Sequence, residues 1–322
     1  MRRKRRLLAP LLVALVVASI VRLPYYSVEP GLAVEIGPLI RVDGHPSFGS
    51  AGRFVLASVE VRQLTPVDAV LAWVDPSREV LQREELFMPG ETREQEARRA
   101  REEMMRSEID AVYAAVSALG EYPGTHGAGA LVESVVAGCP AEGRLRPGDV
   151  IVEIDGSEIG GRRAAGNAID ATGDEVDLVV RRGTDERELS LAREPCAGQD
   201  RPLVGVSLVD EFPFDVAIAD TEVGGPSAGL LFALAVYDRL TPGDLTAGRT
   251  IAGTGTIDLR GRVGPIGGIE QKVQAAERTG ADLFLVPNGN LSGAERVAGD
   301  GLVLIAIRSF DEAVSRLEAV EA

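Results

Sequence analysis

Cysteine and histidine are scarce in this chain of 322 residues, and their scarcity excludes several kinds of site. The two cysteines, Cys139 and Cys196, and the two histidines, His45 and His126, are scattered along the sequence. A zinc site needs such ligands at close, characteristic spacings, so we expect no metal site. The motif G-x-x-x-x-G-K-[ST] is also missing, which excludes an ATPase motor of the usual kind. We therefore expect neither a metal nor a nucleotide cofactor.

Basic residues are outnumbered and unevenly placed. The chain has 34 Lys and Arg against 49 Asp and Glu, a formal net charge of −15 at pH 7. Residues 2–6 are all basic, so the rest of the chain is more acidic still. A body of this charge repels phosphate, so a nucleic-acid partner is not expected. The 45% share of apolar residues suffices for a sizeable core, and the length suggests about two domains, or three small ones.

An uncharged apolar segment, residues 7–21, follows the basic block. Continued through Tyr26, it gives a helix of about 30 Å, the thickness of the hydrocarbon core, if Arg22 snorkels. Tyr25 and Tyr26 suit an interfacial aromatic belt. Residues 1–26 are therefore expected to form a cytoplasmic basic tip and a transmembrane anchor in the bilayer. The chain would then be a single-pass protein of the cell membrane with an extracytoplasmic body.

A cleaved secretory signal is the alternative interpretation, with a cleavage site at residues 16–18. Both interpretations place the body outside the cytoplasm, where Cys139 and Cys196 can form a disulfide. Closing that loop would stabilise the fold by about 4 kcal/mol. The sequence alone leaves paired and free cysteines equally open.

Residues 27–120 are expected to form a small α+β domain. Short apolar runs alternate with turn signals, and residues 54–61 are typical of a strand. Residues 91–119 contain no Gly or Pro and are rich in Glu, Arg, Ala and Met, which predicts a long helix. The charged residues of this helix most simply form a solvent-exposed face, and the segment contains no motif for catalysis or ligand binding.

Residues 121–198 change in character. A strand and a short helix are followed by L-x-x-G-D-x-I at residues 145–151 and by the hairpin turn Asp155-Gly156. This order resembles a PDZ domain, a β-rich module that takes an extended peptide as an added strand. In that family a glycine-rich loop can hold the terminal carboxylate of the peptide. The corresponding loop here, residues 127–130, is less bulky and less apolar than is usual, so a generic peptide groove or a purely structural module is the alternative. The residues expected to contact peptide are Gly127, Gly129, Ala130 and Leu131.

The candidate nucleophile is Ser227, in residues 203–320. A predicted strand at residues 214–219 leads through a Gly-Gly-Pro-Ser sequence into an apolar helix at residues 230–237. Ser227 therefore lies near a helix N-terminus, where unpaired N–H groups and the helix dipole can stabilise an oxyanion. The alternative is a serine that only caps the helix. The expected contacts to the oxyanion or the substrate backbone are Gly224, Gly225 and Ala228.

The candidate base is Lys272, on a helix predicted from Ile269 to Thr279. Ile269, Val273 and Ala276 share an apolar stripe, and Lys272 lies on its flank while the other charges face away. Burial lowers the pKa of a lysine, and the neutral amine can act as a general base. The alternative is a lysine that snorkels from the edge of a packed face.

Both motifs, in this order, resemble the proteolytic domain of Lon-type serine proteases. The resemblance rests on G-P-S-A-G-L at residues 225–230 and on residues 254–268, which lead into Lys272. It implies an α/β proteolytic domain over residues 203–320, with Ser227 as nucleophile and Lys272 as base of a Ser-Lys dyad. Neither histidine lies in this segment, which excludes a His-dependent triad within it. Gly224 departs from the family, in which an acidic residue is usual.

As a whole, the chain resembles a membrane-anchored Lon-type serine protease of bacterial type with a PDZ domain, ATP-independent and α+β in class. The resemblance implies an endopeptidase that cuts flexible or unfolded extracytoplasmic proteins, so the expected partner is a protein or peptide substrate. Rings are common among Lon-type domains, which implies a homo-oligomer. Two alternatives are a non-catalytic peptide-binding membrane scaffold and a phosphate-binding enzyme, although the net charge disfavours the latter.

Overall fold

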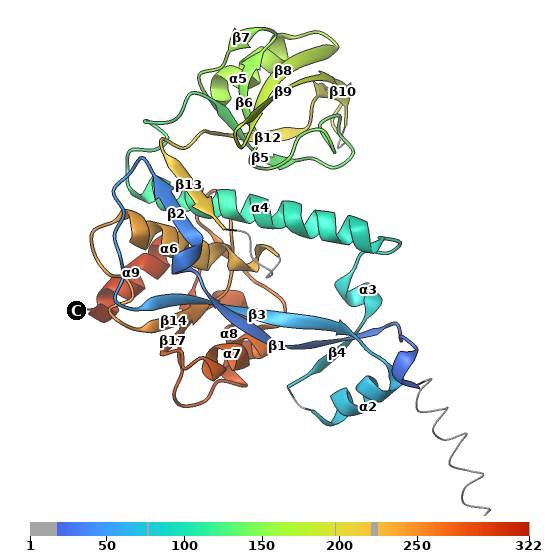
Figure 1. The fold of residues 1–322 in the computed structure, drawn as a ribbon, viewed down its shortest axis with the longest axis vertical. Helices are drawn as coiled ribbons and strands as arrows, with labels where there is room; N and C mark the ends of the chain where they lie inside the picture. Colours follow the sequence, from blue (N-terminus) through green and yellow to red (C-terminus); the bar gives the residue numbers. More distant parts are fainter. Residues whose placement is uncertain (1–17, 76, 197, 220–224, 322) are drawn as a thin grey trace, which may run out of the picture.

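The computed structural model of the chain describes residues 18–75, 77–196, 198–219 and 225–321. A long helix, α4 (Arg93–Ala118), runs between two β-sheets, here called the main sheet and the small sheet (Figure 1). It corresponds to the helix predicted at residues 91–119. Its N-terminus is closed by a capping box between Thr92 and Gln95, which satisfies backbone N–H groups that would otherwise lack a partner.

The main sheet has six strands in the order β18-β17-β14-β3-β1-β4. Pairing is parallel from β18 to β3 and antiparallel from β3 to β4. The sheet therefore combines segments that are predicted to lie in different domains, residues 27–120 and residues 203–320. The strands are β1 (Tyr25–Glu35), β3 (Arg53–Gln63), β4 (Glu79–Gln82), β14 (Thr250–Gly253), β17 (Leu283–Pro287) and β18 (Val303–Ile307).

Helices cover both faces of the main sheet. Alternate residues of a strand point to opposite faces, so Ile251 joins the core under α4, α6 and α9, while Ala252 joins the core under α7. Strands buried on both faces are nearly continuous in apolar residues, as β17 is. These helices are α6 (Gly229–Leu240), α7 (Ile269–Arg278), α8 (Leu291–Glu295) and α9 (Phe310–Glu321).

The small sheet lies on the other side of α4, with the order β12-β5-β6-β8-β9 and β7 paired to β6 (Figure 1). Strand β12 comes from residues beyond 203, yet it completes this sheet by pairing with β5. A separate apolar core fills the space between the sheet and α5. These elements are β5 (Ala130–Val135), β6 (Val150–Ile154), β7 (Ser157–Glu158), α5 (Arg162–Ala171), β8 (Glu175–Arg182), β9 (Asp185–Ala192) and β12 (Val206–Asp210).

The main sheet with its helices and the small sheet with α5 form two units of the molecule, and several short elements complete the fold. Strands β2 and β13 form a separate antiparallel pair, as do β10 with β11 and β15 with β16. The bounds are η1 (Gly37–Leu39), β2 (Ile40–Asp43), α2 (Pro66–Val74), α3 (Arg83–Leu86), β10 (Glu194–Pro195), β11 (Pro202–Leu203), β13 (Asp215–Ile218), η2 (Pro226–Ala228), β15 (Thr256–Ile257), β16 (Val263–Gly264) and η3 (Asn288–Asn290).

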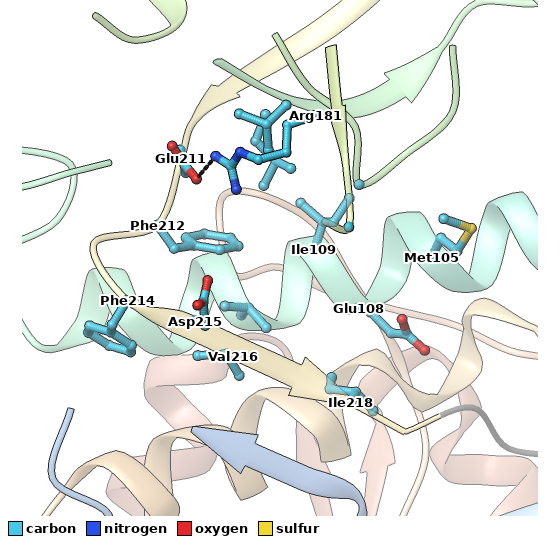
Figure 2. A pocket seen from close by; sticks show the side chains of 15 residues that line it. Met105, Glu108, Ile109, Arg181, Glu211, Phe212, Phe214, Asp215, Val216 and Ile218 are labelled. Carbon is cyan, nitrogen blue, oxygen red and sulfur yellow. Dashed lines mark hydrogen bonds and ion pairs between the residues drawn. The ribbon is translucent and has the colours of Figure 1, made fainter. Parts of the chain in front are cut away.

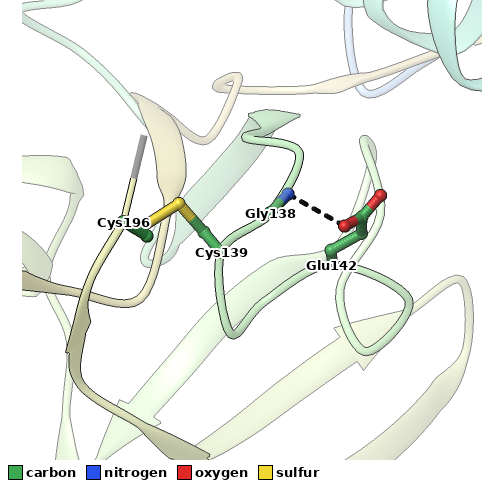
Figure 3. The surroundings of a disulfide bond; sticks show 4 residues. All are labelled: Gly138, Cys139, Glu142 and Cys196. Carbon is green, nitrogen blue, oxygen red and sulfur yellow. Dashed lines mark hydrogen bonds between the residues drawn. A yellow bond between two sulfur atoms is a disulfide. The ribbon is translucent and has the colours of Figure 1, made fainter. Parts of the chain in front are cut away.

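Cys139 and Cys196 are joined by a disulfide, with 5.3 Å between their Cα atoms (Figure 3). The bond ties the loop after β5 to the segment after β10. Gly205, next to the bridge, has φ of +85°, and a Cβ there would lie 2.1 Å from Cβ of Cys139. Only glycine therefore fits between the disulfide and β12.

The expected N-terminal transmembrane helix is a prediction that the structure corrects. Residues 1–17 lie outside the described residues, and Tyr25 already begins β1, where it pairs with Gln82 while Tyr26 pairs with Gln63. These tyrosines belong to a sheet rather than to an interfacial belt. Over the part of the chain that the structure describes, no helix has the length and apolar character to cross a membrane. The transmembrane helix in the predicted fold, and the single-pass localisation that depended on it, are therefore wrong.

Candidate active site

Ser227 lies in the short helix η2, directly before α6. The carbonyl oxygen of Ser227 accepts two hydrogen bonds from the end of β14, at 2.8 Å from N–H of Gly255 and at 2.9 Å from Oγ1 of Thr254. In return, N–H of Leu230 donates to the carbonyl of Gly255 at 3.0 Å. The backbone that carries the serine is thus clamped to the main sheet, which fixes the direction of its hydroxyl.

Lys272 reaches the same point from α7. The helix begins after Gly268, whose φ of +66° suits glycine, and Lys272 follows one turn later with its N–H bonded to the carbonyl of Gly268. Only 4% of Lys272 is exposed. Its Nζ donates to Oγ of Ser227 at 2.7 Å and to Oγ1 of Thr254 at 3.0 Å. The structure therefore brings the two predicted site residues into hydrogen-bond contact.

Burial lowers the pKa of Lys272 to about 8 from its ordinary 10.5. Removing an ammonium from water disfavours the charged form. The ion pairs found among the described residues do not include Lys272, so no carboxylate in this set offsets the effect. The neutral amine that a general base requires is thus far more populated near neutral pH than in an ordinary lysine.

The other predicted contacts around Ser227 are only partly described. Gly224 lies outside the described residues. Gly225 precedes η2 with φ of +106°, a conformation that favours glycine. Ala228 is buried in the core with 1% exposure, so only its backbone can face a substrate. The predicted contact of these three residues with the oxyanion or the substrate backbone therefore stays a prediction.

The predicted peptide contacts of the small sheet fall into two groups. Gly127 and Gly129 enclose Glu211: their N–H groups donate to its carbonyl at 2.9 Å and to its carboxylate at 3.0 Å, respectively. Ala130 and Leu131 lie in β5, which is paired on both sides, with β12 and with β6. Their backbone has no free edge for an added strand, and the nearest edge of the small sheet is β12.

Thr254 is a site residue that sequence reasoning missed. It is fully buried, and its hydroxyl links Nζ of Lys272 to the carbonyl of Ser227. The sequence signal was its place at the start of the stretch that leads into Lys272. A threonine after an apolar run is equally typical of an ordinary strand end.

Thr254→Val is expected to lower kcat/KM about 10- to 100-fold, because the isosteric side chain leaves Lys272 with one acceptor fewer. The lost hydrogen bond stabilised the ammonium, so the acidic limb of the pH–kcat/KM profile should move to lower pH. Thr256→Val, two residues along the chain, is the matched control and should leave the profile unchanged. A Thr254→Val profile that coincides with the native one would show that this hydroxyl does not position the amine.

Comparison with known proteins matches two segments of this chain. Residues 216–316, which include Ser227 and Lys272, match the Lon protease (S16) C-terminal proteolytic domain, and residues 104–192 match the PDZ domain. Lon protease 2 of Herpetosiphon aurantiacus is 41% identical over 91 residues, 27% of this chain and 11% of that protein. Lon protease 2 of Bacillus subtilis is 33% identical over 95 residues, 30% of this chain and 17% of that protein. The chain therefore spans only a small part of these relatives' length.

Among solved structures, the PDZ domain of an SdrC-like protein from Listeria monocytogenes is 27% identical to this chain. The match covers 26% of this chain and 90% of that domain, with a TM-score of 0.24.

Proposed function

Because this chain contains a Lon-type proteolytic domain and a PDZ domain, we propose that it is a serine endopeptidase working through a dyad of Ser227 and Lys272. One observation carries the proposal: a buried amine with a lowered pKa lies 2.7 Å from the hydroxyl of a serine at a helix N-terminus. Such a contact between nucleophile and base is the signature of an activated hydroxyl.

In the proposed reaction, neutral Lys272 accepts the proton of Ser227 as Oγ attacks the carbonyl carbon of a peptide bond. The oxyanion that forms lies at the N-terminal end of α6, where backbone N–H groups and the helix dipole stabilise negative charge. The Lys272 ammonium then protonates the leaving amine, and an acyl group remains on Ser227. Water, deprotonated by the same amine, releases the acyl group and restores the serine.

The substrate class follows from the missing nucleotide-binding motif. These 322 residues contain no G-x-x-x-x-G-K-[ST], so no motor of that kind within them unfolds a target. We infer that cleavage is independent of ATP and acts on flexible or unfolded segments, which the PDZ domain helps to hold.

Cleavage of fluorescein-labelled β-casein, an unfolded protein, tests the proposal. The native chain should cleave it equally with and without ATP, whereas Ser227→Ala should lose at least about 10³-fold in kcat/KM with an unchanged melting temperature. Ser292→Ala, at an exposed position of α8, is the matched control. A fluorophosphonate probe should label the native protein and not Ser227→Ala. Proteolysis by folded Ser227→Ala would overturn the assignment, and a native chain without labelling or cleavage would favour a peptide-binding scaffold.

A further inference from the structure

A cavity of about 360 Å³ lies where the small sheet, α4 and β13 meet (Figure 2). Its walls are largely apolar and come from both units of the molecule. At its rim, Asp215 is exposed and the side chain of Arg181 is 36% exposed, so the cavity opens to solvent. The apolar wall includes Met105 and Ile109 of α4, Leu131 of β5, Phe212, and Val216 and Ile218 of β13.

The strand that lines this cavity has an unpaired edge. β13 pairs with β2 on one side, and within the described residues no strand pairs with its other side. N–H of Ala219 donates to the carbonyl of Leu39, directly before β2. Since backbone groups alternate in direction along a strand, Ala217 also points toward β2, whereas Val216 and Ile218 point their N–H and C=O groups away from it. Both of these residues line the cavity.

The cavity and the loop of the nucleophile contact the same turn of α4, from different faces of the helix. On α4, Met105 and Glu108 line the cavity on either side of Ser107. The hydroxyl of Ser107 donates to the carbonyl of Pro226 at 3.1 Å, directly before Ser227 in the chain. A peptide in the cavity would therefore lie against one face of the α4 turn whose other face supports the active-site loop.

Charge in the cavity is predominantly negative. Arg181 forms an ion pair with Glu211, as Figure 2 shows, and Glu108 and Asp215 are two further acidic residues among those that line the cavity. Apolar walls with an acidic rim fit a segment in which apolar and basic side chains alternate, since alternate residues of a strand point to opposite sides.

We propose that this cavity is a substrate site: an extended peptide segment pairs with the free edge of β13, places apolar side chains in the cavity and directs basic side chains to its acidic rim. The inference rests on the proposed function and assigns that function a preference for segments with basic residues. The site differs from the edge of the small sheet at β12, because it is formed jointly by both units.

Binding to Ser227→Ala separates this site from catalysis. The probe is a fluorescein-labelled peptide of about ten residues with alternating valine and lysine, followed by fluorescence anisotropy. Met105→Trp in the Ser227→Ala background should raise Kd about tenfold or more by filling the cavity. Glu102→Trp, an exposed position on the same helix, is the matched control and should stay within about twofold.

Charge reversal at the rim gives a test that misfolding cannot imitate. Asp215→Lys should weaken binding of the lysine peptide and tighten binding of the corresponding glutamate peptide, each by about three- to tenfold at low salt. Asp185→Lys, at an exposed position of β9, is the control and should alter neither. Binding that is unchanged in both Met105→Trp and Asp215→Lys would overturn the site.

The two proposals can fail separately. If native protein cleaves casein while both cavity variants bind and cleave normally, the cavity is not a substrate site and the endopeptidase assignment stands. If Ser227→Ala binds the lysine peptide as expected but the native chain cleaves nothing, the cavity stands as a peptide site and the endopeptidase assignment is lost.

Discussion

Lys272→Arg is expected to lose at least about 10³-fold in kcat/KM although it keeps the positive charge. A guanidinium does not deprotonate near neutral pH, so it cannot accept the proton of Ser227. It is also larger and planar, and the space around Nζ is closed by Thr254 and Ser227. Steady-state cleavage of casein measures the effect. Activity within about tenfold of the native enzyme would show that another group is the base.

Lys272→Met should be just as inactive, yet more stable than the native chain at pH 7. The folded pKa of Lys272, about 8, lies below the ordinary value of 10.5. Between these values the unfolded chain binds more protons, so stability rises with pH through this window and the full cost of the buried ammonium is present below it. Methionine fills the same apolar site without that cost. Urea unfolding should show a gain of about 1–3 kcal/mol at pH 7, and a smaller gain at pH 10.

A variant that loses both activity and stability would contradict this interpretation of Lys272. Loss of function with a gain of stability is typical of a residue kept for chemistry rather than for folding.

Gly229→Ala is expected to lower kcat/KM about 100-fold without touching either member of the dyad. Gly229 is the first residue of α6, where a Cβ would lie 2.7 Å from Oγ of Ser107 and 2.8 Å from Cγ2 of Ile257. Either α6 or α4 must move to accept it, and Ser227 lies two residues before. Overpacking of this kind should also cost about 1–3 kcal/mol in the free energy of unfolding.

Gly166→Ala is the matched control for that substitution. Gly166 also lies inside a helix, α5, but a Cβ there would meet no atom within 4 Å. Alanine is the better helix former, so this variant should be slightly more stable and fully active. Equal activities in the two glycine variants would mean that the packing of α6 against α4 does not set the position of Ser227.

The residues of the candidate site were predictable because their signals are local. Ser227 is marked by the glycine-bounded start of an apolar helix, and Lys272 by its place beside an apolar helical stripe. Both signals extend over only a few residues. Thr254 joins them only after β14 and α7 pack together, which no short window of sequence records.

Long-range pairing explains most of what the sequence did not predict. Strand β3 pairs with β14, almost 200 residues away, and β12 crosses a predicted boundary to pair with β5. Such contacts leave no periodic trace, because each strand is compatible with several partners. Long-range pairing also takes up the end of the predicted transmembrane segment, since Tyr25 and Tyr26 pair with Gln82 and Gln63 in the main sheet.

The protonation of Lys272 tests the dyad most directly, and the composition makes the measurement simple. The chain has only two lysines, Lys4 and Lys272. Labelling lysine with ¹³C at Cε therefore gives two resonances, which Lys4→Arg assigns, and their shifts can be followed from pH 6 to 11. The account predicts that Lys272 titrates with a pKa of about 8, and that the acidic limb of the kcat/KM profile has the same midpoint. A pKa for Lys272 near the ordinary value of about 10.4, with full activity at pH 7, would contradict it.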